Sequence, residues 1–413
     1  MAGFIQKGAR NILQKNPHDV VFLSAVRTPV TKAKKGGLRD AYDHEILSFA
    51  LKAILDRTPN LDPSLIQDVQ IGTVLSELGG SKAGRMASLH VGYPATSAFA
   101  TVNRACSSGL AAITAVAQSI AVGAIDVGVG GGMESMTRNY GSRAIPTQLW
   151  KELKDSPVKD ARDCIMSMGL TAENVAERYG VGRKEQDEFA AKSHQKADKA
   201  QKEGLFNEEI VPVTTRWRPD PEVPENEDQI TVTKDDGIRP GSTAEKLAGM
   251  KPAFKETGSA TAGNSSQVSD GAAAALMMRR STATELGLGN QIIGKWAGTQ
   301  VVGTLPDEMG VGPAVAIPKL LDYTGINKDE VGIWEINEAF ASQALYCIRK
   351  LGIDEAKVNP KGGAIALGHP LGATGGRQLA TLLPEMKRQG QELGVVSMCI
   401  GTGMGMASLI VRE

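Results

Sequence analysis

The chain has 413 residues, of which 41% are hydrophobic and 22% charged, and its 46 basic and 46 acidic side chains give a formal net charge of zero. These values match globular proteins and exclude a disordered or fibrous chain. The balanced charge also gives no support to a nucleic-acid partner held by bulk charge. The length fits two or three domains, or one large α/β unit.

The first 18 residues are basic, with Lys7, Arg10 and Lys15 and no acidic side chain. Two interpretations remain open for this segment, namely an organelle-targeting sequence or a frayed basic N-terminus. Nowhere does an apolar run reach the length that a membrane span needs, so we expect no membrane-spanning helix.

The next segments alternate between strand and helix patterns. A short apolar run predicts a buried strand over Val20–Ala25, helical spacing predicts a helix over His44–Leu55, and Val69–Val74 is strand-like. Gly109–Val122 is small and apolar nearly all round, which predicts a buried helix, and Asp126–Gly132 predicts a strand that runs into a glycine turn. This alternation favours an α/β architecture.

The middle of the chain, from about Asn139 to Gly258, is richer in charge. Thr171–Tyr179 and Lys184–Gly204 have the pattern of exposed amphipathic helices, and a Pro-, Glu- and Asp-rich stretch runs from Arg218 to Asp228. We interpret this region as an insertion or lid with a surface loop near its middle.

The α/β pattern returns after Gly263, so the chain has two α/β halves with an excursion between them. The predicted elements of the second half are Gly271–Met278, Ile292–Trp296, Gly332–Ile336, the helix Ala339–Leu351, Thr374–Gln389 and the apolar stretch Val395–Val411.

Cys106 is the first candidate for chemistry, because it stands in VNRACSSGL just before a predicted helix. The helix dipole and its unpaired N–H groups are expected to lower the pKa of such a thiol. The alternative is an inert buried cysteine. The four cysteines are far apart and form no CxxC pair, which argues against a structural zinc site and a disulfide framework.

Two further candidates stand among glycines near the C-terminal end. His369 lies in GGAIALGHPLGATGG, a loop whose glycines let backbone approach a ligand, and its alternative is a satisfied loop histidine. Cys399 ends an apolar strand, where Gly401 can present an N–H to an oxyanion, and its alternative is a core cysteine. Asn337 follows a predicted strand and could cap the next helix, or hold a water or a carbonyl oxygen.

Together these segments resemble the thiolase family over almost the whole chain, from about Val20 to Val411. Seven sequence blocks in order carry the resemblance: NRACSSGL around Cys106, GGMESM at 131–136, MGLTAENVAERY at 168–179, TAGNSSQVSDGAAA at 261–274, NEAFA at 337–341, GGAIALGHPLG at 362–372 and CIGTGMGMA at 399–407.

The resemblance implies a thiolase fold, an α/β architecture in which two similar βαβαβαββ halves stack into a five-layered αβαβα sandwich with an inserted loop (lid) domain. The implied domains are an N-terminal leader at 1–19, a first half at 20–138 plus 259–290, the lid at 139–258 and a second half at 291–413. A homodimer is implied, with a tetramer as an alternative.

The resemblance also implies roles for five catalytic positions. Cys106 matches the acylated nucleophile, His369 the base that activates it, and Cys399 the second acid/base. Asn337 matches the residue that holds a water in one oxyanion hole, shared with His369. The backbone N–H groups of Cys106 and Gly401 match the second hole.

Coenzyme A is implied as a substrate together with acyl-CoA, with no tightly bound cofactor and no metal. Five positions match residues that contact coenzyme A in the family: Met168, Arg239, Phe254, Ala262 and Ser266.

The activity implied by the closest blocks is that of a degradative, peroxisomal-type 3-ketoacyl-CoA thiolase of fatty-acid β-oxidation. A biosynthetic acetoacetyl-CoA thiolase is the alternative, although Ser167 stands where some biosynthetic relatives carry a histidine. A β-ketoacyl synthase is disfavoured by the Cys399 block, and a non-catalytic lipid carrier by the presence of both cysteines and His369. The family favours a peroxisomal location, whereas the basic leader would suit mitochondria.

Overall fold

The computed structural model describes residues 7–220, 223 and 226–413 of the chain. The first six residues of the predicted leader, and four residues of the Pro- and acid-rich loop, lie outside this part. In the described ranges, no helix is both long and apolar enough to cross a membrane.

Ten strands form one hydrogen-bonded sheet with the order β10-β11-β12-β9-β1-β8-β5-β3-β4, and β2 pairs with β8. The junction between β1 and β9 is narrow, because it joins only Val20–Phe22 to Gly294–Trp296. The sheet therefore divides into two half-sheets. The first contains β1 (Val20–Arg27), β2 (Thr31–Lys32), β3 (Asp68–Gly72), β4 (Ala98–Val102), β5 (Val127–Ser135) and β8 (Ser269–Arg279); the second contains β9 (Gly294–Gly303), β10 (Ile333–Ile336), β11 (Leu393–Ile400) and β12 (Met404–Arg412).

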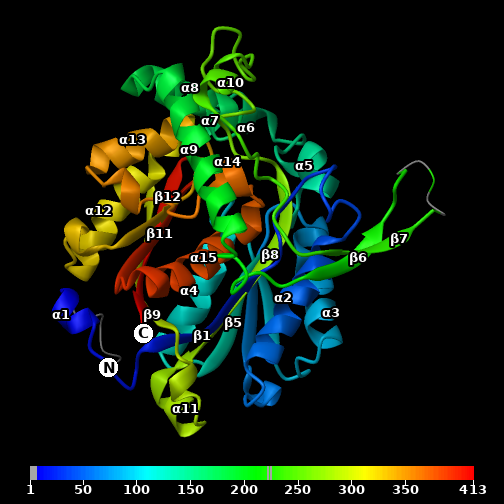
Figure 1. Cartoon of the computed structure of the whole chain (residues 1–413), viewed down its shortest axis with the longest axis vertical. Helices are drawn as coiled ribbons and strands as arrows, with labels where there is room; N and C mark the ends of the chain where they lie inside the picture. The colour runs from blue at the N-terminus through cyan, green and yellow to red at the C-terminus, as the bar shows by residue number, and fades with distance from the viewer. Residues whose placement is uncertain (1–6, 221–222, 224–225) are drawn as a thin grey trace.

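Helices form three layers around these half-sheets, which gives the five-layered αβαβα order of the predicted fold (Figure 1). One outer layer packs on the first half-sheet, and the other covers the second. The middle layer lies between the half-sheets and receives one helix from each half of the chain. The outer helices are α2 (Asp43–Arg57), α3 (Ser81–His90), α12 (Gly312–Thr324) and α13 (Ala341–Leu351), and the middle ones are α4 (Ser108–Ala121) and α15 (Thr374–Gln389).

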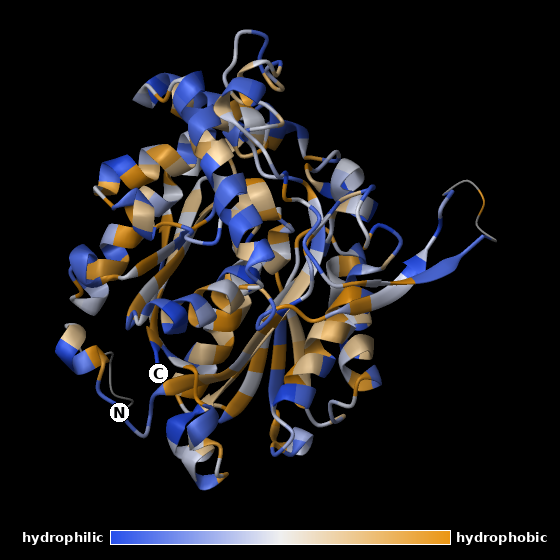
Figure 2. Cartoon of the chain, in the orientation of Figure 1, coloured by the Kyte–Doolittle hydropathy of each residue, from blue (hydrophilic) through white to orange (hydrophobic). Residues whose placement is uncertain are grey.

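The strands are apolar on both faces because each face packs against a helix layer. In β1, Val21 belongs to the outer core with α2, whereas Phe22 belongs to the middle core with α4 and α15. In β11, Val395 and Val396 divide in the same way between the outer and middle cores. Figure 2 shows hydrophobic colour concentrated on the strands and on the helix faces turned toward them. This packing explains why the strands read as continuous apolar runs in the sequence.

The predicted lid region lies at one end of the molecule, except for a hairpin that projects from its side (Figure 1). The hairpin differs from the plain surface loop that we expected, since paired strands flank the Pro- and acid-rich stretch. After the lid, β8 returns to the first half-sheet between β1 and β5. The elements of this region are α5 (Met136–Arg143), α6 (Lys151–Lys154), α7 (Lys159–Asp163), α8 (Met168–Tyr179), α9 (Arg183–Lys202), β6 (Val213–Trp217), β7 (Asp228–Val232) and α10 (Ala244–Ala248).

The described part of the basic N-terminal segment is packed rather than frayed. It contains the short helix α1 (Ala9–Ile12), and Ile12 is buried in the outer core of the second half. The Lys295 ammonium donates to the carbonyl oxygen of Gln14 at 2.7 Å and lies 3.2 Å from an Asp19 carboxylate oxygen. From Ala9 onward, this segment is therefore anchored to the second half of the chain.

Candidate active site

Cys106 lies in the loop between β4 and α4, two residues before the helix begins. Ala105, which precedes it, has a φ of 43°, a left-handed conformation that costs a non-glycine residue about 1–3 kcal/mol. The loop is held by Ser108, whose Oγ accepts the Arg104 N–H at 2.8 Å and donates to the Ala105 carbonyl at 2.6 Å. These bonds fix the backbone on both sides of the sulfur-bearing residue.

The expected lowering of the Cys106 pKa is wrong. Burial raises the pKa of this thiol by more than the hydrogen bond from the Gly401 N–H lowers it, and the Glu134 carboxylate raises it further. Cys106 is only 8% exposed, so loss of water outweighs the helix terminus. The nucleophile candidate therefore rests as a neutral thiol and needs a base to become a thiolate.

His369 lies between α14 (Ala364–Leu367) and α15, and it is oriented through both ring nitrogens. Its Nδ1 is 2.6 Å from Thr374 Oγ1, and its Nε2 is 3.4 Å from Asn337 Nδ2. Because an amide NH₂ only donates, this arrangement assigns the ring proton to Nδ1 and a lone pair to Nε2. Burial, assisted by the positive charge of Arg377, lowers the pKa of His369 to about 3. The imidazole is thus neutral and able to accept a proton.

Asn337 follows β10 directly, and its backbone N–H donates to the Ser397 carbonyl of β11 at 2.9 Å. The helix-capping alternative is wrong, because the residue that caps α13 is Phe340. The Asn337 Oδ1 atom is buried and has no hydrogen-bond partner among the described residues. Such an atom costs about 1–3 kcal/mol unless a water or a ligand group donates to it. The position is therefore suited to holding a water or a substrate donor.

Cys399 occupies the end of β11 and is completely buried. Its Sγ donates to Gln343 Oε1 of α13 at 3.4 Å. Burial raises the pKa of Cys399 well above its usual value, and the neighbouring Cys106 sulfur adds to this effect. A thiol with this environment holds its proton and can deliver it to a strong base.

Gly401 stands in the turn between β11 and β12, where three segments of the chain meet. A side chain at this position would lie 3.5 Å from the Met168 sulfur of α8 and 3.8 Å from the Ala105 side chain. The hairpin turn, the nucleophile loop and the first turn of the lid helix are therefore in contact. This contact also brings the Gly401 N–H to the Cys106 sulfur.

The structure thus brings the five predicted catalytic residues into one connected set. Cys106 interacts with Gly401 and Cys399, Asn337 binds the strand that carries Cys399, and His369 lies against Asn337. In the part of the chain that the structure describes, no group of three or more His, Cys, Asp or Glu side chains is arranged to hold a metal ion. The groups gathered here are a neutral base, two thiols and N–H donors, which suit acyl transfer.

Three of the residues predicted to contact coenzyme A lie beside this set. Met168 packs in the small apolar cluster that contains Cys399 and Phe340. The Phe254 ring meets Phe340 edge-on, with the centroids 5.9 Å apart, and remains 40% exposed. The Ser266 N–H donates at 2.9 Å to the carbonyl of the residue before Phe340. These three residues therefore lie around Ala339 and Phe340, next to Cys399.

The other two residues predicted to contact coenzyme A are placed differently. The Arg239 N–H donates to His194 Nδ1 of α9 at 3.2 Å, and its side chain is partly exposed. Ala262 is exposed. Within the described ranges, neither residue contacts Met168, Phe254 or Ser266 through a hydrogen bond.

Thr374 and Gln343 support the site but were missed in the sequence. Thr374 orients His369 from the first position of α15, and a hydroxyl five residues beyond a loop histidine was a weak signal. Gln343 was a stronger signal, since it is a buried polar residue on the apolar face of α13. Its Nε2 atom is buried and has no partner in the described part of the chain.

Comparison with known proteins matches two family descriptions to this chain. "Thiolase, N-terminal domain" matches residues 20–281, and "Thiolase, C-terminal domain" matches residues 290–412. A peroxisomal 3-ketoacyl-CoA thiolase of Yarrowia lipolytica is 50% identical over 98% of this chain and 96% of its own. The human peroxisomal 3-ketoacyl-CoA thiolase is also 50% identical, over 96% of this chain and 91% of its own.

Solved structures of related enzymes are also similar to this chain. The dimeric peroxisomal thiolase of Saccharomyces cerevisiae has a TM-score of 0.88 and 46% identity, covering 97% of this chain and 99% of its own. An acetyl-CoA acetyltransferase of Bacillus anthracis has a TM-score of 0.85 and 36% identity, covering 96% of this chain and 99% of its own. The similarity therefore extends over both halves and the lid.

Proposed function

The chain belongs to the thiolase family, and from this premise we propose that it is a 3-ketoacyl-CoA thiolase, an acyltransferase of fatty-acid β-oxidation. It would cleave 3-ketoacyl-CoA with coenzyme A to give acetyl-CoA and a shortened acyl-CoA. The observation that carries the proposal is that two interacting buried thiols and a neutral imidazole, from distant parts of the chain, belong to one connected set in which Asn337 links His369 to the strand of Cys399.

In the first half-reaction, His369 Nε2 takes the proton of Cys106, and the resulting thiolate attacks the 3-keto carbon. The bond between C2 and C3 then breaks, which leaves an acyl thioester on Cys106 and the enolate of acetyl-CoA. Cys399 gives its proton to C2 of this enolate, and acetyl-CoA leaves. The lowered pKa leaves the His369 imidazole unprotonated at neutral pH, so the Nε2 lone pair is free to take the proton, although the same shift makes the imidazole a weaker base.

In the second half-reaction, coenzyme A enters and its thiol gives a proton to the Cys399 thiolate. The coenzyme A sulfur attacks the acyl-Cys106 thioester, and the shortened acyl-CoA departs. Cys106 recovers its proton from His369. Protons and electrons balance over the two steps, and coenzyme A is the only co-substrate that this ping-pong route uses.

Two oxyanions form along this path. The N–H groups of Cys106 and Gly401 would hold the oxyanion at the carbon under attack, which agrees with the Gly401 N–H facing the Cys106 sulfur. Asn337, through a water, and His369 would hold the enolate oxygen. Losing one such donor typically costs about 10²–10³ in rate.

Coenzyme A would bind along the lid side, at Met168, Arg239, Phe254, Ala262 and Ser266. Met168, Phe254 and Ser266 lie around Ala339 and Phe340, next to Cys399, so this side of the site suits the pantetheine arm. Arg239 is partly exposed and offers a positive charge for the phosphates of coenzyme A.

We also propose a homodimer that forms through the free edge of β4. This strand pairs with β3 on one side, and no other described strand pairs with its second edge. Met86, on the neighbouring helix α3, is 70% exposed. An unpaired strand edge beside apolar side chains favours association with a second copy. The solution mass from light scattering would separate a dimer from a monomer or tetramer.

A peroxisomal location is proposed from the similarity to peroxisomal relatives, with mitochondria as the alternative. Imaging a fusion of the first roughly 30 residues to a fluorescent protein tests whether that segment is the targeting signal. The full chain with the same tag, placed internally or at either end, reports the compartment itself.

Thiolysis of 3-ketoacyl-CoA substrates of increasing acyl length tests the activity. We expect turnover of long and medium chains, whereas activity confined to acetoacetyl-CoA would favour the biosynthetic alternative. Cys106→Ala is expected to abolish turnover while the fold is retained, and Cys164→Ala, a partly exposed thiol of the lid, serves as the matched control. Turnover by Cys106→Ala at the wild-type rate would overturn the proposal.

Cys399→Ala separates the two thiols. Cys106 in this variant is expected to react with iodoacetamide as in the wild type, while turnover is lost because no acid protonates C2. Normal turnover would contradict the acid/base role of Cys399.

A further inference from the structure

A line of hydrogen-bonded side chains connects Glu134, whose charge acts on Cys106, to a cavity lined by Asp43, His44 and Ser76. Glu134 Oε1 is 3.4 Å from Thr73 Oγ1, which is 2.6 Å from Ser76 Oγ. Ser76 donates to Asp43 Oδ2, and Asp43 Oδ1 is 3.0 Å from Nδ1 of His44. Apart from the two end residues nearest the cavity, the line is buried.

Glu134 links the segments that carry the catalytic groups. It is completely buried on β5, and its carboxylate accepts the N–H groups of Val74 and Leu75, each at 3.0 Å. It also accepts the N–H of Gly372, three residues after His369, at 2.9 Å. Its charge acts on the Cys106 thiol. Glu134 therefore holds the histidine loop and sets part of the electrostatic field at the nucleophile.

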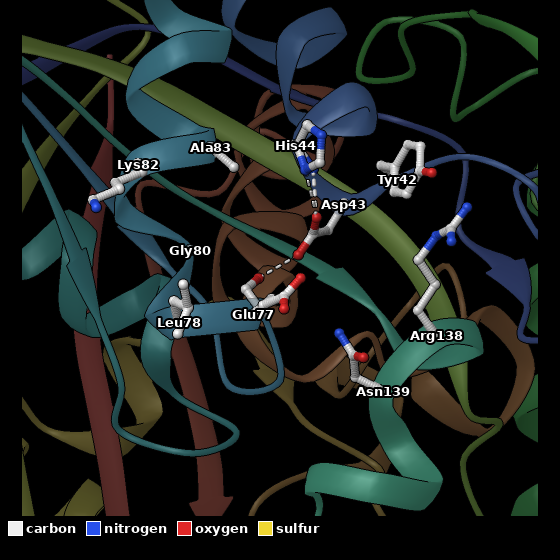
Figure 3. Close-up of a pocket in the computed structure, with 11 residues that line it drawn as sticks. Tyr42, Asp43, His44, Glu77, Leu78, Gly80, Lys82, Ala83, Arg138 and Asn139 are labelled. Carbon is white, nitrogen blue, oxygen red and sulfur yellow. Dashed lines mark hydrogen bonds and ion pairs between the residues drawn. The ribbon is translucent and has the colours of Figure 1, made fainter.

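The far end of the line opens into a cavity of about 450 Å³. Figure 3 shows the His44 ring and the Asp43 carboxylate in this cavity, with the dashed bonds from His44 to Asp43 and from Asp43 onward. The His44 side chain is 39% exposed. Solvent protons can therefore reach Asp43 without crossing the apolar core.

The number of protons along the line is informative. The two short contacts, Asp43 to Ser76 and Ser76 to Thr73, use both hydroxyl protons, with Thr73 donating to Ser76 and Ser76 to Asp43. In this state Thr73 presents only lone pairs to Glu134, so their contact is a hydrogen bond only when Glu134 carries a proton. When the proton is on Asp43 instead, both hydroxyls turn and Thr73 donates to Glu134 Oε1. The arrangement has a place for one further proton, shared between two carboxyl groups.

We propose that Glu134 is a proton-holding positioning residue of the catalytic centre, and that Thr73, Ser76 and Asp43 exchange its proton with the cavity at His44. When the proton leaves, Glu134 passes it to Thr73, Thr73 passes its own to Ser76, and Ser76 passes its own to Asp43. Each hydroxyl ends with one proton, and the reverse shift restores the first state. This inference rests on the proposed role of Cys106 as the nucleophile.

The electrostatics of the two carboxyl groups agree with this assignment. Burial, together with the Asp43 charge, raises the pKa of Glu134 to about 7 despite its backbone hydrogen bonds. The pKa of Asp43 is lowered, because its bonds to His44 and Ser76 outweigh its burial. The titratable groups that face Glu134 are Asp43 of α2 and Cys106 before α4. The shared proton therefore resides on Glu134 below a pH of about 7.

The state of Glu134 adds to the effect of burial on the Cys106 thiol. A Glu134 carboxylate raises the pKa of the Cys106 thiol, whereas protonated Glu134 does not. In Glu134→Gln, alkylation of Cys106 by iodoacetamide should reach its midpoint at a pH lower by roughly 0.5–1 unit than in the wild type. A merely structural role would weaken the fold or turnover without moving this midpoint downward.

The direct test is infrared titration of the folded protein. We expect a carbonyl-stretch band of a protonated carboxylic acid that disappears as the pH rises through about 7 and is absent in Glu134→Gln. In Asp43→Asn, the midpoint of this band should move to lower pH, because the Asp43 charge that raises the Glu134 pKa is gone. Asp56→Asn, an exposed carboxylate at the other end of α2, is the matched control and should leave the midpoint unchanged.

Absence of a band that depends on Glu134, or an unshifted midpoint in Asp43→Asn, would overturn the proposal. Both readouts follow the carboxyl group and the thiol rather than turnover, so they are independent of substrate identity. A failure of the thiolase assignment would leave the infrared result standing, which keeps the two proposals distinguishable.

Discussion

Two buried polar regions of this molecule differ in the charge of their groups: one contains paired ions, and the other contains neutral groups. Beside β1, Arg27 bonds Glu209 at 2.6 Å and Asp235 at 2.7 Å, and Lys361 bonds Glu209 at 2.6 Å. At the catalytic centre, the groups lack such counter-charges, and burial keeps His369 and both thiols neutral.

This difference in charge indicates which region stabilises the fold and which can exchange protons. Although burial raises the pKa of Glu209, the charges of Lys361 and Arg27 hold it below its usual value, so the carboxylate stays ionised. Fully paired charges have little freedom to gain or lose a proton. Neutral groups with perturbed pKa values are poised to exchange protons with one another. The first region stabilises the fold, and the second is available for chemistry.

The largest expected effect comes from breaking the paired region. Arg27→Met removes the cation between Glu209 and Asp235 and should lower the free energy of unfolding by about 3–5 kcal/mol, because two buried carboxylates lose their partner. Urea denaturation measures this loss. Lys52→Met, which removes the exposed pair with Asp56, should cost less than about 0.5 kcal/mol. Equal losses for the two variants would refute the contrast.

Asn337→Ala should affect chemistry rather than stability. Removing the amide that we assign to an oxyanion hole is expected to lower kcat by about 10²–10³. Steady-state thiolysis measures the change, and Asn327→Ala, at an exposed helix cap, is the control. A kcat near the wild-type value would show that Asn337 is not in the oxyanion hole.

His369→Gln tests how much the buried, neutral imidazole reduces the stability of the fold at acidic pH. The folded pKa of about 3 lies below the ordinary value of 6.5, so the unfolded chain binds more protons and stability falls as pH drops between these values. We expect the glutamine variant to be inactive. Between neutral pH and roughly pH 4.5, its free energy of unfolding should fall by about 2 kcal/mol less than that of the wild type. Denaturation at both pH values measures this, and the exposed His18→Gln should behave like the wild type.

The smallest effect is expected at Thr374. Thr374→Val removes the hydroxyl on His369 Nδ1 and should lower kcat by about fivefold, because the imidazole loses an orienting hydrogen bond of about 1 kcal/mol. Thr284→Val on α11 (Arg280–Glu285) provides a control for the same substitution at a helix hydroxyl away from the site. An unchanged kcat would mean that packing alone orients the ring.

Much of the fold was predictable because periodicity and glycine positions are local signals. The helix Thr374–Gln389 was predicted at its observed bounds, and the family blocks identified the layers. β4 was missed because its residues are mostly exposed or partly exposed and form no apolar run. α12 was missed because Pro318 lies inside it and interrupts the usual helical signal. The stretch Val395–Val411 is two strands, separated by a turn with Thr402 and Gly403 at positive φ.

At the site, the residues that could carry chemistry were identifiable, whereas their electrostatic state was not. The helix terminus at Cys106 was visible in the sequence, but the depth of its burial depends on β11 and the lid, which are distant in the chain. Gln343 and Glu134 act through contacts between distant parts of the chain, and single-sequence patterns do not encode such contacts.

The middle layer has a consequence for biosynthesis. Since α4 follows Cys106, whereas α15 follows His369, the reactive cysteine is translated long before the base and the second thiol. The catalytic set is therefore complete only in a chain whose second half has been translated and whose α15 packs between the two half-sheets.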